Sequence, residues 1–169
     1  MNLAMQSESN ASVFPTNTEY SPEARTVLRM LDDALDHLSD TGGGHQRLQN
    51  ALSELNDVYR ECCEANWDGY GARAVTEAAY TEAYKLLMLL PSDIQTPKFV
   101  PEPNGAIALE WFRGRRFIFV ASVRGDNCIL YAGLFGMNKV HGTEYFGDSL
   151  PFSIVLNINR LYSCSLPAN

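Results

Sequence analysis

The stretch KFVPEPNGAIALEW, from Lys98 to Trp111, decides the fold class because the hydrophobic pattern changes within it. Apolar residues before it recur every three or four positions, as on one face of a helix. Within it, Ile107, Leu109 and Trp111 occupy every second position, as in a half-buried strand. Asn104-Gly105 is a strong turn signal, although the connection is longer than the two residues of a tight hairpin. The sequence therefore predicts helices before this stretch and antiparallel strands after it.

Further turn signals divide the second half of the chain into strands. Arg113-Gly114 and the run 124–127 are predicted turns, and Gly136-Met137-Asn138 introduces a last candidate strand over 139–146. Together these signals predict a meander of four or five strands. One face collects the alternating apolar residues, and we expect the helices to cover it. Its expected members are Ile107, Leu109, Trp111, Phe117, Phe119, Ala121 and Val123.

Helical periodicity occurs in three segments before the sheet and in one after it. The first segment starts at Ser21-Pro22, a capping residue and a first-turn proline, and ends at the glycines 42–44. The second runs from Leu48 to Cys62, and the third starts at Thr76 and ends before Pro91. Residues 148–162 fit either a strand or a helix, and the proline near their start favours a helix.

These elements predict an α+β fold with a helical hairpin and a third helix packed on a four- to five-stranded antiparallel meander, followed by a C-terminal helix. The length of 169 residues fits one domain. We expect a flexible arm over residues 1–20, which is rich in Ser, Asn and Thr, and a single domain over 21–169. No basic leader or long apolar run is present, so the sequence predicts a cytoplasmic protein that does not enter a membrane.

Charge is divided unevenly along the chain, whose net charge is -7. Residues 1–96 carry fifteen acidic and six basic residues, whereas residues 97–169 carry five acidic and seven basic ones. An acidic helical half beside a mildly basic sheet suggests that the two halves of the molecule present opposite charges to partners. Ordinary solvation of exposed helix faces is the simpler explanation of the same pattern.

Cysteine and histidine spacing gives no sign of a metal site. The four cysteines contain no C-x-x-C pair, and no histidine stands at ligand spacing from a cysteine or from another histidine. We therefore expect free structural thiols, with no metal and no cofactor.

The segment NWDGYGA, residues 66–72, forms a predicted corner between the second and third helices. Glycines at 69 and 71 permit a tight reversal there, and Trp67 is expected to pack into the core. Together with P-x-P-x-G-x-I-x-L-E-W at 101–111, the segment resembles a pattern in small uncharacterised bacterial and mobile-element proteins. The resemblance spans roughly residues 60–162. It implies membership of defence, toxin–antitoxin or counter-defence loci, and so implies interaction with a partner more than chemistry.

Two carboxylates are the catalytic candidates of this chain. Asp68 and Glu110 would make an acid–base pair if the fold brought them together, with the pKa of one raised for general-acid work. The competing interpretation is that Asp68 caps the corner through backbone N–H groups and that Glu110 faces solvent on a strand.

Partner binding has three candidate surfaces. Asp32, Asp33, Asp36 and Asp40 lie along the first predicted helix and suit a basic protein surface. Tyr70 at the glycine corner is a candidate anchor. Arg113, Arg115 and Arg116 would allow a phosphate contact, although a solvated turn is the favoured explanation.

The leading hypothesis is a non-catalytic module that binds and regulates or inhibits a protein partner, as an antitoxin or counter-defence protein does. The alternatives are a small enzyme with an acidic cleft at the WDGYG corner and, third, a nucleic-acid-binding protein. A homodimer through the outer face of the sheet is a further possibility. Met137, Tyr131, Tyr145 and Ile118 are the residues expected to make that face adhesive.

Overall fold

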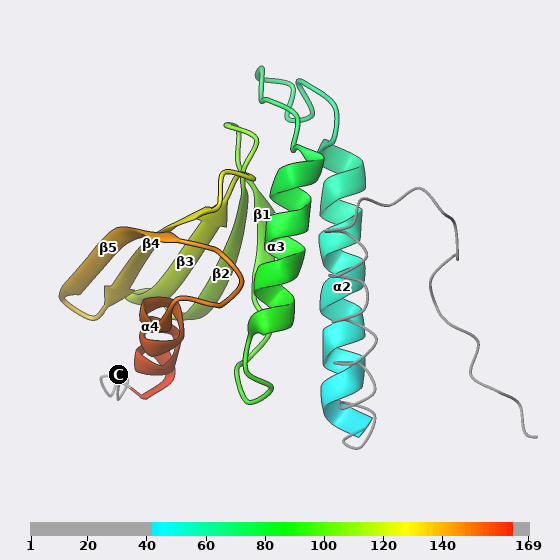
Figure 1. Ribbon diagram of the computed structural model, residues 1–169. Helices are drawn as coiled ribbons and strands as arrows, with labels where there is room; N and C mark the ends of the chain where they lie inside the picture. The colour runs from blue at the N-terminus through cyan, green and yellow to red at the C-terminus, as the bar shows by residue number, and fades with distance from the viewer. Residues whose placement is uncertain (1–41, 164–169) are drawn as a thin grey trace, which may run out of the picture.

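The computed structural model describes residues 42–163, which form an α+β arrangement with a five-stranded antiparallel sheet (Figure 1). The predicted fold class is confirmed. The first predicted helix, the arm over 1–20 and the candidate residues Asp32, Asp33, Asp36 and Asp40 lie outside the described residues. The elements are α2 (Gly42–Cys62), α3 (Glu77–Leu89), β1 (Lys98–Pro101), β2 (Ile107–Gly114), β3 (Phe117–Val123), β4 (Cys128–Phe135), β5 (Asn138–Tyr145) and α4 (Phe152–Ser163).

The strands form a meander in the order β1-β2-β3-β4-β5, so each strand pairs with its neighbours in sequence. The register places Leu109 opposite Ala121 and Trp111 opposite Phe119, as the alternating pattern predicts. Burial alternates strictly along β3, and every residue of the predicted covered face is buried. The Trp111 indole also donates a 2.7 Å hydrogen bond to the carbonyl of Gln95, so this large side chain is buried without an unsatisfied donor.

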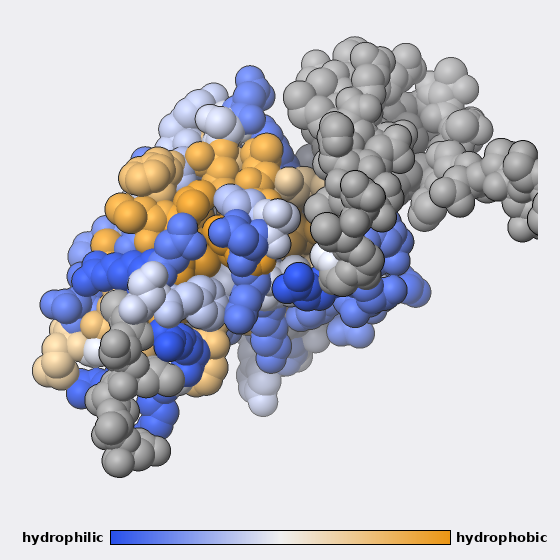
Figure 2. Space-filling view, turned by 90° about the horizontal axis from the view of Figure 1, so that it is seen from below, coloured by the Kyte–Doolittle hydropathy of each residue, from blue (hydrophilic) through white to orange (hydrophobic). Residues whose placement is uncertain are grey.

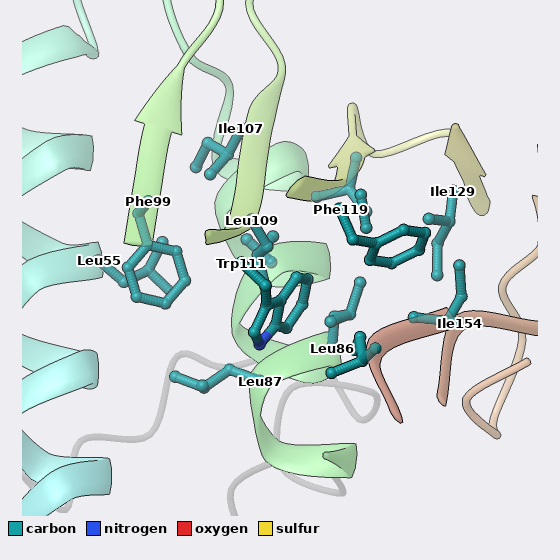
Figure 3. Packing of buried hydrophobic residues seen from close by; sticks show 14 of the residues in the cluster. Leu55, Leu86, Leu87, Phe99, Ile107, Leu109, Trp111, Phe119, Ile129 and Ile154 are labelled. Atoms are coloured by element: carbon teal, nitrogen blue, oxygen red, sulfur yellow. The ribbon is translucent and has the colours of Figure 1, made fainter. Parts of the chain in front are cut away.

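Among the described helices, α3 and α4 cover most of this face; covering by α3 was expected, whereas the C-terminal helix α4 was not assigned to it. Helix α3 packs on β2 and β3, and α4 packs on β2, β3 and β4. Leu86 of α3 and Ile154 of α4 meet Phe119 on the same side of the sheet (Figure 3). Helix α2 instead lies along β1 and α3, at one edge of the sheet.

Helix α3 has the predicted start and end. Thr76 is its N-cap and accepts a 3.1 Å hydrogen bond from the Ala79 N–H, and Leu90 closes it before Pro91. Helical spacing predicts an inward face of Tyr80, Ala83, Tyr84, Leu87 and Leu90, but the buried face is turned by about one position, because Tyr80 and Tyr84 are only half-buried. The buried positions are Ala79, Glu82, Ala83, Leu86 and Leu87.

Helix α2 begins at Gly42, so the glycines predicted to connect two helices belong to its first turns. Glycine costs about 1 kcal/mol relative to alanine inside a helix. The stripe that follows, including the buried Ala51 and Leu55, packs on the rest of the core and outweighs this local cost.

The β2–β3 turn consists of Arg115 and Arg116, so the prediction of a turn at Arg113-Gly114 is wrong. Arg113 is instead a bulged residue of β2, since the register passes from Phe112 directly to Gly114. Its guanidinium donates hydrogen bonds of 3.1 and 2.8 Å to the carbonyls of Leu161 and Tyr162 at the end of α4. This cation therefore satisfies the last carbonyls of a helix, where the macrodipole favours positive charge.

Candidate functional site

The NWDGYGA corner is a closed network of backbone hydrogen bonds between α2 and α3. The Asn66 N–H donates to the Ala72 carbonyl at 2.7 Å, and the Asn66 side chain accepts from the Gly71 N–H at 2.8 Å. Asn66, Gly69 and Gly71 all have positive φ, which asparagine and glycine adopt most readily. Local hydrogen bonding thus accounts for this unusual segment.

The corner is joined to the β1–β2 turn, so the two halves of the sequence pattern meet in space. The Arg73 N–H donates a 2.9 Å hydrogen bond to the Pro103 carbonyl. Gly105 lies against Ala74 so closely that a Cβ at 105 would stand 2.8 Å from the Ala74 carbonyl oxygen. The spacing of the pattern therefore reflects one packed junction at the end of the helices and strands.

Asp68 and Glu110 are not brought together by any described contact. Asp68 Oδ1 accepts hydrogen bonds from the N–H groups of Tyr70 at 2.8 Å and Ala72 at 3.0 Å, as the capping interpretation predicts. The N–H of Tyr70, followed by that of Ala72, holds the pKa of the Asp68 carboxyl below its usual value. A carboxyl with this shift stays ionised at neutral pH, which is the opposite of what a general acid needs.

The capping role of Asp68 predicts a pH-dependent stability. Because folding lowers the pKa of this carboxyl, its contribution is present above the unfolded-state pKa near 3.8 and is lost as the pH falls through the folded-state value. We expect the difference in melting temperature between the wild type and Asp68→Asn to shrink as the pH is lowered from 6 toward 2. Thermal unfolding of both proteins across this range, with Glu64→Gln as the charge-matched control, measures it. A difference independent of pH would contradict the ionised cap.

The two aromatic residues of the corner lie in different surroundings. Trp67 is half-buried against the core, and its indole donates a 3.0 Å hydrogen bond to the Arg73 carbonyl. Tyr70 is 95% exposed. Trp67 therefore supports the corner, whereas Tyr70 presents its ring to solvent from a fixed loop.

The basic residues do not form one described patch. Arg113 binds the end of α4, and Arg124 pairs with Asp126 at 3.1 Å in the β3–β4 turn. Arg115 and Arg116 are exposed in the β2–β3 turn, at the other end of β3. This separation gives the phosphate-binding expectation little support.

Glu82 is a buried carboxylate that the sequence pattern did not single out. It is 8% exposed on α3 and receives hydrogen bonds from the Gly125 N–H at 2.6 Å and the Asn127 N–H at 2.5 Å. It therefore fastens α3 to the β3–β4 turn. Its position on the inward side of α3 could have indicated a buried carboxylate. Its partners could not be predicted, because they lie more than forty residues away.

The outer face of the sheet, opposite α3 and α4, is the largest candidate site. The alternate register positions of β1 to β4 on this side are mostly apolar, and Lys98, Glu110 and Ser122 are the polar residues among them. Phe112 is 62% exposed and Leu130 is 43% exposed. We call the following residues the outer face: Val100, Ala108, Phe112, Ile118, Val120, Leu130, Ala132 and Leu134. Hydrophobic surface is also prominent in the molecule seen from below, where it forms a broad area bordered by hydrophilic residues (Figure 2).

Two of the residues expected on the outer face have other positions. Tyr131 lies on the covered face, opposite Ala121 and Gly142, and its ring centroid is 6.0 Å from that of Phe119. Met137 is exposed in the β4–β5 turn. Ile118 is on the outer face as expected, and Tyr145 continues that face on β5.

One hollow borders the outer face near the start of β1. It has a volume of about 370 Å³ and brings Lys98 and Glu110 together with Phe112 and Tyr162. Burial raises the pKa of the Tyr162 hydroxyl, and the charge of Arg113 opposes this shift.

Metal-binding and membrane-spanning features are not found between residues 42 and 163. No three His, Cys, Asp or Glu residues of this part gather as metal ligands. None of its helices combines the length and apolar composition that crossing a bilayer requires. Its cysteines, Cys62, Cys63 and Cys128, are free thiols.

Comparison with known proteins returned no matching family model, no matching curated protein and no matching solved structure.

Proposed function

We propose that this chain is a non-catalytic interaction module that binds a protein partner and regulates or inhibits it, as antitoxin-like or counter-defence-like proteins do. The observation that carries the proposal is the apolar outer face, which the described helices leave open because they pack on the other side of the sheet. Contiguous apolar surface of this kind is typical of protein–protein contact sites.

The outer face combines exposed apolar residues with charged and polar ones, since Glu110 lies between Ala108 and Phe112 on the same side of β2. Phe112 and Leu130 are its exposed large residues, and covering each would stabilise a complex by roughly 1–2 kcal/mol, from about 1.5–3 kcal/mol for complete burial. Lys98 and Glu110 lie on the same side of β1 and β2, directly opposite each other in the register. Ser122 and Glu102 are joined by a 2.7 Å hydrogen bond at another border. Charged and polar residues beside the apolar ones then select the partner.

The test is a pull-down from the native host in which three proteins are compared by native mass spectrometry. We expect the wild type to hold a stoichiometric partner and Leu130→Lys to lose it, because a charge would be buried in the contact. Leu130 is exposed enough for lysine to leave the fold intact. Asn56→Lys, on the exposed side of α2, introduces the same charge and should keep the partner.

A further variant separates the outer face from the acidic residues of the first predicted helix. Replacing Asp32, Asp33 and Asp36 together by asparagine removes three charges that suit a basic partner. If this variant loses the partner and Leu130→Lys keeps it, the binding surface is the acidic one and the outer-face assignment is wrong. If the wild type never holds a stoichiometric partner, the proposed function itself is contradicted.

A further inference from the structure

The two edges of the sheet differ in whether their outward backbone N–H groups can pair with another strand. At the β1 edge, the hydrogen bond from the Glu102 N–H to the Ala106 carbonyl extends the β1–β2 register and turns the even-numbered residues of β1 toward β2. The outward positions are then Phe99 and the two prolines, Pro97 and Pro101, which have no N–H. The Phe99 N–H donates to Glu54 Oε1 of α2 at 3.4 Å. This edge is thus closed to another strand.

The β5 edge has no proline and no described hydrogen bond to a helix side chain. The Phe146 N–H donates to the Asn127 carbonyl at 2.7 Å, which extends the β4–β5 register and turns the even-numbered residues of β5 toward β4. The hydrogen bond from the Gly136 N–H to the Arg116 carbonyl gives the same alternation in β4, whose odd-numbered residues then face β5. The outward N–H and C=O groups of β5 therefore belong to Lys139, His141, Thr143 and Tyr145.

Those outward groups have no described partner. Of the described elements, β5 contacts β4 alone, and Figure 1 shows it at the edge of the sheet farthest from α2. The strand has eight residues, no proline and no irregularity in its register with β4. A regular strand with an unpaired edge of this length is a template for a further strand.

We propose that β5 pairs antiparallel with β5 of a second copy of this chain, around a two-fold axis at Gly142, to form one continuous sheet through both copies. Outward groups belong to odd-numbered residues, so Lys139 pairs with Tyr145 of the second copy and His141 with Thr143 of the second copy. Every outward N–H and C=O group of the strand is then satisfied. The edge is distinct from the outer face, so this pairing goes beyond the proposed function.

Side chains suit a second copy paired in this register. No like charges stand opposite each other, because Lys139 meets an aromatic ring and Glu144 meets Val140. Shifting the axis to His141 would place two histidines opposite each other and leave Tyr145 beyond the paired region. At Gly142, a Cβ would lie 2.5 Å from the Tyr131 hydroxyl oxygen, so the Tyr131 ring lies across β5 where the axis passes. The axis would bring the two Tyr131 rings together there.

Amide hydrogen exchange on the full chain tests the pairing, because only the odd-numbered amides of β5 would gain protection from it. We expect sedimentation to give twice the chain mass of 18.8 kDa at micromolar concentration. In that species, the amides of Lys139, His141, Thr143 and Tyr145 should exchange at least tenfold more slowly than at dilutions that dissociate it. Val140, Gly142 and Glu144 should be protected at both concentrations, because their amides bind β4. A chain that stays monomeric, or a dimer whose odd-numbered amides exchange as in the monomer, would overturn the proposal.

Two substitutions at one position supply a matched comparison. Thr143→Pro removes an outward N–H without removing a bond to β4, so it should raise the dimer dissociation constant at least tenfold. Thr143→Ala keeps the N–H and should dimerise as the wild type does. If the proline variant fails to fold by circular dichroism, the exchange pattern of the wild type decides alone. Protection of the odd-numbered amides by a co-purified foreign chain, without self-association, would overturn the choice of a second copy. Leu130→Lys should dimerise normally, which keeps this test separate from that of the proposed function.

Discussion

Replacing Glu82 by alanine lowers the free energy of unfolding by about 3 kcal/mol. The carboxylate of Glu82 is buried and accepts from the N–H groups of Gly125 and Asn127. Alanine removes both hydrogen bonds, and a hydrogen bond to a charged group contributes about 1.5–3 kcal/mol. Gly125 and Asn127 are exposed, so water recovers part of that loss, and the expected total lies at the lower end of the summed range of about 3–6 kcal/mol.

Urea unfolding of Glu82→Ala and Glu77→Ala measures this effect against a matched control. Glu77 is an exposed glutamate in the first turn of the same helix, where loss of a favourable charge costs below about 1 kcal/mol. Glu82→Gln retains one acceptor oxygen and should fall between the wild type and Glu82→Ala. Equal losses for the two alanine variants would show that Glu82 does not hold the turn.

Replacing Gly125 by alanine has a comparable effect, about 3 kcal/mol, for a different reason. Gly125 has a φ of +86°, and a Cβ there would stand 2.3 Å from the Cβ of Ala78 on α3. The left-handed conformation costs a non-glycine residue about 1–2 kcal/mol. Displacing α3 from the turn adds about 1–3 kcal/mol, as overpacking does in cores.

Gly71, a glycine in open surroundings, separates the conformational cost from the steric cost. Gly71 has a φ of +92°, but a Cβ there would meet nothing within 4 Å, so Gly71→Ala should cost only the conformational part, about 1–2 kcal/mol. Adding Ala78→Gly to Gly125→Ala should restore stability relative to the sum of the single changes, with a coupling of at least about 0.5 kcal/mol. Additive losses would show that the Cβ of Ala78 is not the atom that opposes a side chain at position 125.

Local sequence signals predicted the elements of this fold better than their packing. The two-residue period and the turn residues identified the strands of the meander, and the buried side of Phe119 and Leu109 followed from alternation alone. The choice of a helix over a strand at 152–163 followed from Pro151. Which helices cover the sheet depends on contacts between distant segments, so the covering role of α4 was not predicted.

The roles of the candidate site residues were likewise predictable only where their partners lie close in the sequence. The capping by Asp68 is local, with partners two and four residues away, and the turn chemistry of aspartate indicates it. Arg113 was interpreted as a turn residue because its partners, the carbonyls at the end of α4, lie 48 and 49 residues further along the chain. No spacing rule connects such residues, so their roles required the structure.

The place of α4 in the chain has a consequence for synthesis. The sheet is complete at Tyr145, and the helix that covers β3 and β4 begins only at Phe152. During translation at about 5–20 residues per second, the strands can pair in order as they leave the ribosome, because each neighbour in space is a neighbour in sequence. Ile129 and the part of Phe119 that α3 does not cover then remain exposed for roughly a few seconds until α4 emerges. The nascent chain therefore offers a chaperone a transient apolar surface that the finished protein no longer has.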